Sequence, residues 1–218
     1  MEHAVSKLQS WTSRDIQIVE ALTLKTRVMT LDQIARLWWP KSKNGASDAK
    51  KRILKLRKAG CIERYQINTH PIISMVSPVT QWRPNLEVPD FSSVAWKLKQ
   101  RWILTHTPTW VFVATRRAAN LFGSFGGKLK DPLQVTHDIH LSEVYLKYSF
   151  EFPGQADRWV GEDAFLKAGH GIKDPDAFLL DENGTITKVV EFGGKYSADR
   201  VEQFHRHCEE RELEYELW

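Results

Sequence analysis

Apolar residues recur at helical spacing in three successive segments near the start of the chain, and two strand-like runs follow them. Thr12 or Ser13 can cap the first helix and Thr30 the second, which Pro40 ends. The elements predicted by these patterns are helices at about 16–22, 31–38 and 46–60 and strands at about 61–67 and 72–76. Three helices followed by a two-stranded hairpin are typical of a winged helix-turn-helix domain.

Prolines divide this region from the rest of the chain. Pro84 and Pro89 mark a connector, after which the pattern predicts a helix at 91–102, a short strand at 110–113 and a helix at 115–121. We therefore expect three parts, which are a winged helix-turn-helix domain at 1–83, a connector with helices at 84–136 and an α/β domain at 137–218.

The C-terminal part has the predicted element order α-β-β-β-α-β. A helix at about 138–148 and a strand around Trp159 precede two apolar strands, which are joined by an Asn183–Gly184 turn that tolerates positive φ. A further helix and a strand at 215–218 complete the order. This order permits a mixed sheet with helices on its faces, so the predicted fold class is α+β.

Two carboxylates flank the hairpin formed by these two strands. If 177–180 pairs with 186–191, Asp176 and Glu191 come to the same end of the hairpin, one from each strand. Two carboxylates and a nearby cation such as Lys195 can form a divalent-cation site for phosphodiester chemistry. The alternative is that Asp176 caps a turn, Glu191 ends a strand in water and Lys195 is a surface lysine.

The composition is that of an ordinary globular protein, with 218 residues and a net charge of +4. No apolar run approaches the roughly 20 residues that span a bilayer, and no signal pattern opens the chain, so we expect a cytoplasmic protein with no membrane partner. Cys61 and Cys208 are too few and too far apart for a disulfide framework or a zinc site.

The positive charge is concentrated in the first half of the chain. Between Lys41 and Lys58 there are eight basic residues and one acidic residue, Asp48. Because the third helix of a winged helix-turn-helix enters the major groove, double-stranded DNA is the expected partner. The residues expected to contact DNA are Lys41, Lys43, Ser47, Lys50, Lys51, Lys55 and Arg64. The alternative is a solvated helix face in a protein-interaction module.

The C-terminal element order, with Asp176 after Pro175 and Glu191 one strand later, resembles the core of the PD-(D/E)XK nuclease superfamily. The resemblance implies that Asp176 and Glu191 hold Mg or Mn, that a lysine orients the attacking water and that a glutamate of the first helix, here Glu143, assists. The superfamily places its lysine where Gly193 stands, and Lys195 comes two residues later. A bulge at Gly193 and Gly194 would bring Lys195 inward.

The whole chain is also similar to the replication-relaxation family of plasmids and other mobile elements. The matching features are the predicted winged helix around Arg14–Asp15, the His137–Asp138 helix start, the 175–177 step and the strand that ends at Glu191. In members of that family the last strand continues as Glu-x-Asp-Arg-Gly, whereas here the sequence from Glu191 is EFGGK.

The family resemblance implies a DNA-binding protein of plasmid replication or mobilisation with a nuclease-like C-terminal domain, and a homodimer is one assembly left open. The alternative is an active, divalent-metal-dependent DNA endonuclease that the winged helix directs to its target.

Overall fold

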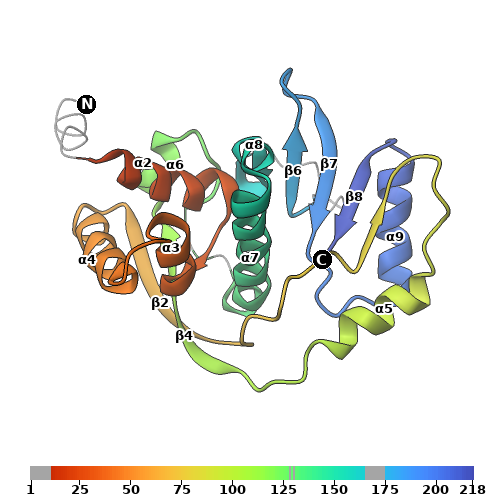
Figure 1. The fold of residues 1–218 in the computed structure, drawn as a ribbon, viewed down its shortest axis with the longest axis horizontal. Helices are drawn as coiled ribbons and strands as arrows, with labels where there is room; N and C mark the ends of the chain where they lie inside the picture. The colour runs from red at the N-terminus through yellow and green to blue at the C-terminus, as the bar shows by residue number, and fades with distance from the viewer. Residues whose placement is uncertain (1–10, 128, 130, 165–174) are drawn as a thin grey trace.

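The computed structural model describes residues 11–127, 129, 131–164 and 175–218 (Figure 1). Its strands form two sheets, one of three strands in the order β1-β4-β2 and one of five strands in the order β3-β8-β7-β6-β5. Helix α7 (Val135–Glu151) lies between the two sheets in Figure 1. The protein therefore belongs to the α+β class predicted from its sequence.

The N-terminal helices begin at the predicted capping residues. The Thr12 hydroxyl accepts the N–H of Asp15, whose carboxylate accepts the N–H of Thr12 in return, and Thr30 and Gln33 form the same reciprocal pair. These bonds satisfy backbone donors that a helix start leaves open, and so they fix where the helices begin. The elements of this part are α2 (Ser13–Glu20), the π-helical turn η1 (Ala21–Lys25), β1 (Met29–Thr30), α3 (Leu31–Trp38) and α4 (Gly45–Lys58).

The strand after α4 has its partner far along the chain. β2 (Ile62–Thr69) runs antiparallel to β4 (Thr107–Ala114), whose other edge pairs with β1. The prediction of a partner strand at 72–76 is wrong. That segment is apolar because it packs against the core, where the Ile73 side chain contacts buried apolar residues and the Ile73 N–H donates to His140 Nε2 at 3.1 Å.

The connection from β2 to β4 reaches the second sheet. It supplies strand β3 (Thr80–Trp82), which pairs with β8, and helix α5 (Phe91–Gln100), which packs beside α9 (Figure 1). His70 ties the two ends of the connection together, because its Nε2 accepts the Leu104 N–H at 3.2 Å. Each sheet is thus built from separate stretches of chain. The domain boundary expected at position 83 lies between β3 and α5, both of which pack in or on the second sheet.

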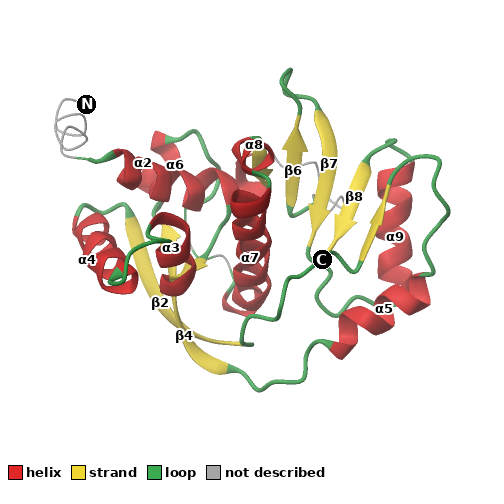
Figure 2. Cartoon of the chain, viewed as in Figure 1, coloured by secondary structure: helices red, strands yellow, loops and turns green. Residues whose placement is uncertain are grey.

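The second sheet is mixed. β6 (Ala177–Leu180) and β7 (Ile186–Glu191) form the expected antiparallel hairpin, with Gly184 at a φ of +82° in its turn. β7 runs parallel to β8 (Glu214–Leu217), because helix α9 (Ala198–Glu209) carries the chain back between them. Helices α5 and α9 pack on one face of this sheet and α7 on the other (Figure 2). The remaining elements are α6 (Arg116–Leu121), η2 (Pro132–Gln134), α8 (Pro153–Asp157), β5 (Trp159–Gly161) and η3 (Glu162–Ala164).

Helix α7 is buried on most of its sides. Ile139 packs with Val111 of the first sheet, whereas Tyr148 lies against Trp159 of the second, with ring centroids 5.2 Å apart. The same helix therefore contributes to the cores beside both sheets, which places its first turn close to each of them. A membrane-spanning helix is not found anywhere in the described part of the chain.

Helix α5 offers a matched test of this packing, since Leu98 is fully buried and Trp96 on the same helix is 63% exposed. Leu98→Ala should lower the free energy of unfolding by about 2–5 kcal/mol, because it opens a cavity against α9 and the second sheet. Trp96→Ala should change it by only about 0.5 kcal/mol, as expected for a surface site. Urea denaturation of both variants measures the difference, and equal losses would contradict the docking of α5.

Candidate functional site

The predicted DNA-binding residues lie on α4, in the segment before it and on β2. All seven are exposed: Lys41, Lys43, Ser47, Lys50, Lys51, Lys55 and Arg64. The inner face of α4 is held by buried Ala49, Ile53 and Leu56. Within the described residues, no carboxylate pairs with Lys50, Lys51 or Lys55. Their charges are therefore available to a polyanion.

One basic residue of α4 has a structural role instead. The guanidinium of Arg52 forms a bidentate ion pair with the buried carboxylate of Asp15, and the same carboxylate caps α2. A bidentate pair of this kind fixes the angle as well as the distance between two elements. Arg52 therefore holds α4 against α2 and orients the basic face.

Arg64 reaches this face from β2. Its guanidinium carbon lies 4.0 Å from the centroid of the Trp110 ring on β4, and Trp110 is 43% exposed. The sequence predicted Trp110 only as part of a strand. Neighbouring residues of a strand point to opposite faces of the sheet. Because Val111 is buried on the α7 side, the sequence position of Trp110 next to it indicates that the Trp110 side chain lies on the other face.

The β6–β7 hairpin brings Asp176 and Glu191 together, as predicted. Glu191 Oε2 accepts the Asp176 N–H at 3.1 Å, and Asp176 Oδ2 accepts the Phe192 N–H at 2.8 Å. The Tyr196 hydroxyl donates to Glu191 Oε1. Both carboxylates are buried, with 4% exposure at Asp176 and 1% at Glu191. Each carboxylate therefore forms a hydrogen bond with the backbone at the end of the opposite strand of the hairpin.

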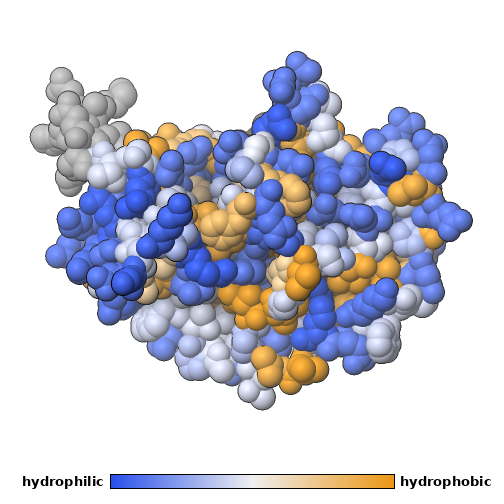
Figure 3. All heavy atoms as spheres, in the orientation of Figure 1, coloured by the Kyte–Doolittle hydropathy of each residue, from blue (hydrophilic) through white to orange (hydrophobic). Residues whose placement is uncertain are grey.

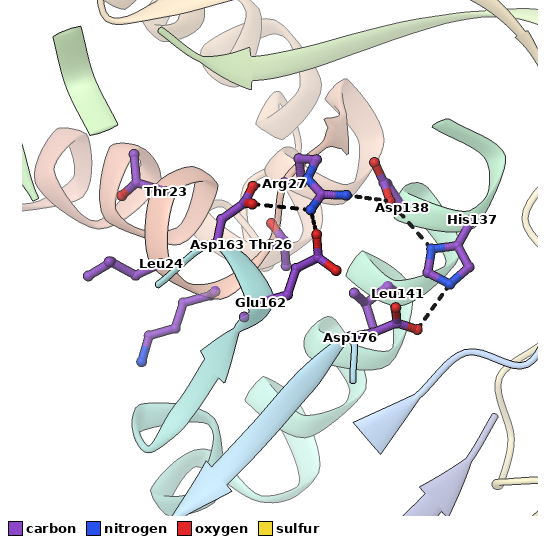
Figure 4. A pocket seen from close by; sticks show the side chains of 12 residues that line it. Thr23, Leu24, Thr26, Arg27, His137, Asp138, Leu141, Glu162, Asp163 and Asp176 are labelled. Carbon is purple, nitrogen blue, oxygen red and sulfur yellow. Dashed lines mark hydrogen bonds and ion pairs between the residues drawn. The ribbon is translucent and has the colours of Figure 1, made fainter. Parts of the chain in front are cut away.

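The cation beside Asp176 is His137, at the start of α7. Its Nε2 lies 3.0 Å from Asp176 Oδ2, and its Nδ1 lies 3.4 Å from Asp138 Oδ1 (Figure 4). Burial disfavours a charged imidazole, but the two carboxylates outweigh it and raise the pKa of His137 to about 10. His137 is therefore an imidazolium at neutral pH and neutralises the Asp176 end of the hairpin.

Arg27 extends this charge network to the N-terminal half. It follows η1 and pairs with Asp163 at 2.9 Å, with Asp138 at 3.5 Å and with Glu162 (Figure 4). Burial lowers the pKa of its guanidinium, but the hydrogen bonds that it donates to Asp163 and the charges of the surrounding carboxylates outweigh that effect and raise the pKa. The network links the segment before β1, the first turn of α7 and the loop after β5. Sequence reasoning missed it because its members are far apart in the chain.

Lys195 and Glu143 have contacts of their own, with Trp102 and Arg36. Lys195 is exposed, with its Nζ 5.8 Å from the centroid of the Trp102 ring. The expected bulge is absent from β7, which ends at Glu191, and the chain turns instead, with Gly194 at a φ of +54° and Tyr196 N–H bonded to Gly193 O.

Gly193 leaves no room for a side chain in this turn, because a Cβ there would lie 2.9 Å from Leu98. Glu143 points to α3 and accepts hydrogen bonds from Arg36 at 2.6 and 2.8 Å. Burial works against the charge of Glu143, but Arg36 holds the pKa of its carboxyl below the ordinary value. Glu143 thus pairs with Arg36, whereas Asp176 and Glu191 meet at the end of the hairpin.

Both carboxylates of the pair accept hydrogen bonds from protein donors. Glu191 offers both oxygens to protein donors, and Asp176 Oδ2 serves Phe192 N–H and His137 together. No group of three or more His, Cys, Asp or Glu within the described ranges is placed to hold a metal.

Comparison with known proteins gives no match to this chain, whether with protein-family models, with curated proteins or with solved structures. Its function is therefore inferred from its own residues and their arrangement.

The raised pKa of His137 makes a prediction about stability. The folded state holds this proton up to about pH 10, whereas the unfolded chain releases it near pH 6.5. The stabilisation from His137 should be complete below about pH 6.5 and should fall as the pH rises towards 10. His137→Gln should therefore cost on the order of a few kcal/mol at pH 6.5 and much less at pH 10.

Urea unfolding of wild type and His137→Gln across this pH range measures the effect. His106→Gln, at an exposed histidine, serves as the control and should leave the pH profile unchanged. A His137→Gln cost that stays constant from pH 6.5 to 10 would refute the ion pair with Asp176.

Proposed function

We propose that the protein binds double-stranded DNA through the exposed basic face of α4. The observation that carries this proposal is that Lys50, Lys51 and Lys55 are exposed and unmatched by carboxylates within the described residues. Phosphate neutralisation is the commonest use of such a face. Figure 3 supports it, since the surface over α4 is strongly hydrophilic.

We infer that the N-terminal half is a winged helix. The order α2, β1, α3, α4, β2, β4 supports this assignment, with α4 as the recognition helix. The pairing of β2 with β4 supplies the two long strands of a wing. The hairpin between them is replaced by the connection to the second sheet, so α4 and the strand surface beside it are the parts left to contact DNA.

We infer further that the C-terminal half has a PD-(D/E)XK-like fold that serves as a scaffold. The mixed sheet and the Asp176–Glu191 pair support the likeness, and the engagement of both carboxylates by protein donors supports the structural role. Because the chain resembles the replication-relaxation family, we propose that the protein binds DNA during replication or mobilisation of a plasmid or other mobile element, in the cytoplasm.

The salt dependence of binding tests the role of α4. If Lys50, Lys51 and Lys55 neutralise phosphates, replacing all three with Ala should flatten the slope of log K against log salt by about 0.9 per lysine. Fluorescence polarisation with a labelled duplex measures the slope. The matched control is the double variant Lys97→Ala and Lys99→Ala, which removes exposed charges from α5 and should leave the slope unchanged.

An equal slope and affinity in the triple variant, with its fold intact by circular dichroism, would contradict the assignment. A slope that falls equally in the α5 control would show that net charge, rather than this face, governs binding.

The second candidate function is metal-dependent cleavage, which the meeting of Asp176 and Glu191 favours. The scaffold role predicts no nicking of supercoiled plasmid by the wild-type protein in Mg or Mn. Nicking that appears in Mn and disappears in Glu191→Gln would establish the endonuclease instead.

A further inference from the structure

A groove runs between α4 and the first sheet, directly beside the basic face. Its volume is about 170 Å³, several times the roughly 30 Å³ that one water takes in the liquid. Leu54 and Trp110 expose apolar surface in it, and Lys50, Arg57 and Arg64 supply positive charge. The groove therefore combines apolar walls with a cationic rim.

Arg64 and Trp110 form a stacked pair at this groove, with the guanidinium over the indole ring. Phe112, two residues along β4 on the same face of the sheet, is buried beneath the helices, whereas Trp110 lies beyond their cover and stays open to solvent. The guanidinium of Arg64 lies over the indole at 4.0 Å. Nucleic-acid bases stack on both kinds of surface, on aromatic rings and on arginine planes.

We propose that this groove holds an unpaired DNA base, stacked on the exposed Arg64 guanidinium that itself lies over the Trp110 indole, while the surrounding cations neutralise the flanking phosphates. The proposal rests on the proposed DNA binding and specifies its substrate as DNA that contains unpaired bases. A base pair inside a duplex is covered by its neighbours on both faces, whereas an unpaired base can leave the stack and offer a face to this surface. The cationic lining favours a nucleotide over an apolar peptide segment as the occupant.

The test compares a blunt duplex with the same duplex carrying a single unpaired thymine, using the full chain at one fixed salt concentration. Wild type should bind the bulged duplex more tightly. Trp110→Ala should weaken binding to the bulged duplex by about tenfold, the usual scale for one stacked base, and should affect the blunt duplex much less.

Two further variants separate stacking from charge and from groove shape. Arg64→Lys keeps the charge but removes the planar group, so it should also lose preference for the bulged duplex. Leu54→Ala alters the apolar wall without touching the Arg64–Trp110 pair and should retain the preference. Arg64→Lys carries the test alone if Trp110→Ala fails to fold by circular dichroism.

Equal weakening of both duplexes by Trp110→Ala would overturn the proposal, as would no effect on either, or a wild-type preference for the blunt duplex. These results would leave the DNA-binding role of α4 in place. The DNA-binding role of α4 has its own test. It is contradicted if the triple variant of Lys50, Lys51 and Lys55 binds the blunt duplex as tightly as wild type does.

Discussion

The burial of helix α7 between two sheets is the constraint on which the rest of the structure depends. A helix with apolar residues on most of its sides must be covered on most of its sides. The first sheet supplies one cover and the second sheet another, and the connection from β2 to β4 has to cross between them. The first turn of α7 thereby meets the hairpin end at Asp176 and the segment that carries Arg27.

Charge compensation follows from this burial. Asp138 and Asp176 lie in the interior, where an unpaired carboxylate costs several kcal/mol. His137 and Arg27 bring positive charge to them, and the Phe192 N–H adds a hydrogen bond to Asp176. Repulsion between Asp176 and Glu191 would favour a bound cation. Hydrogen-bond donors and the His137 imidazolium of the protein itself offset this repulsion. The two carboxylates therefore contribute to closing the hairpin of β6 and β7.

Local patterns made much of the fold predictable. The capping threonines Thr12 and Thr30 fixed two helix starts, and Asn183–Gly184 identified the hairpin that unites Asp176 and Glu191. The pairing of β2 with β4 was not predicted, because the two strands are far apart in the sequence. The apolar run at 72–76 is nearer to β2 and was predicted to be its partner. Strand pairing over such a separation leaves no local signal.

Two of the residues predicted for the catalytic group have other partners in the structure. Glu143 comes six residues after His137, which turns it away from the Asp176 side of a 3.6-residue helix and towards Arg36. Lys195 follows two glycines that turn the chain out of the strand, so it lies over Trp102. The position of Glu143 on its helix could be read from the sequence, whereas the contact between Gly193 and Leu98 joins residues far apart in the chain.

Lysine footprinting of the wild-type protein tests the central claim most directly. Acetylation of each lysine is followed by mass spectrometry with and without duplex DNA. We expect DNA to protect Lys50, Lys51 and Lys55 on α4, while Lys97 and Lys99 on α5 react as before. Unchanged reactivity along α4, with protection on α5 or at Lys195 instead, would contradict DNA binding through this face.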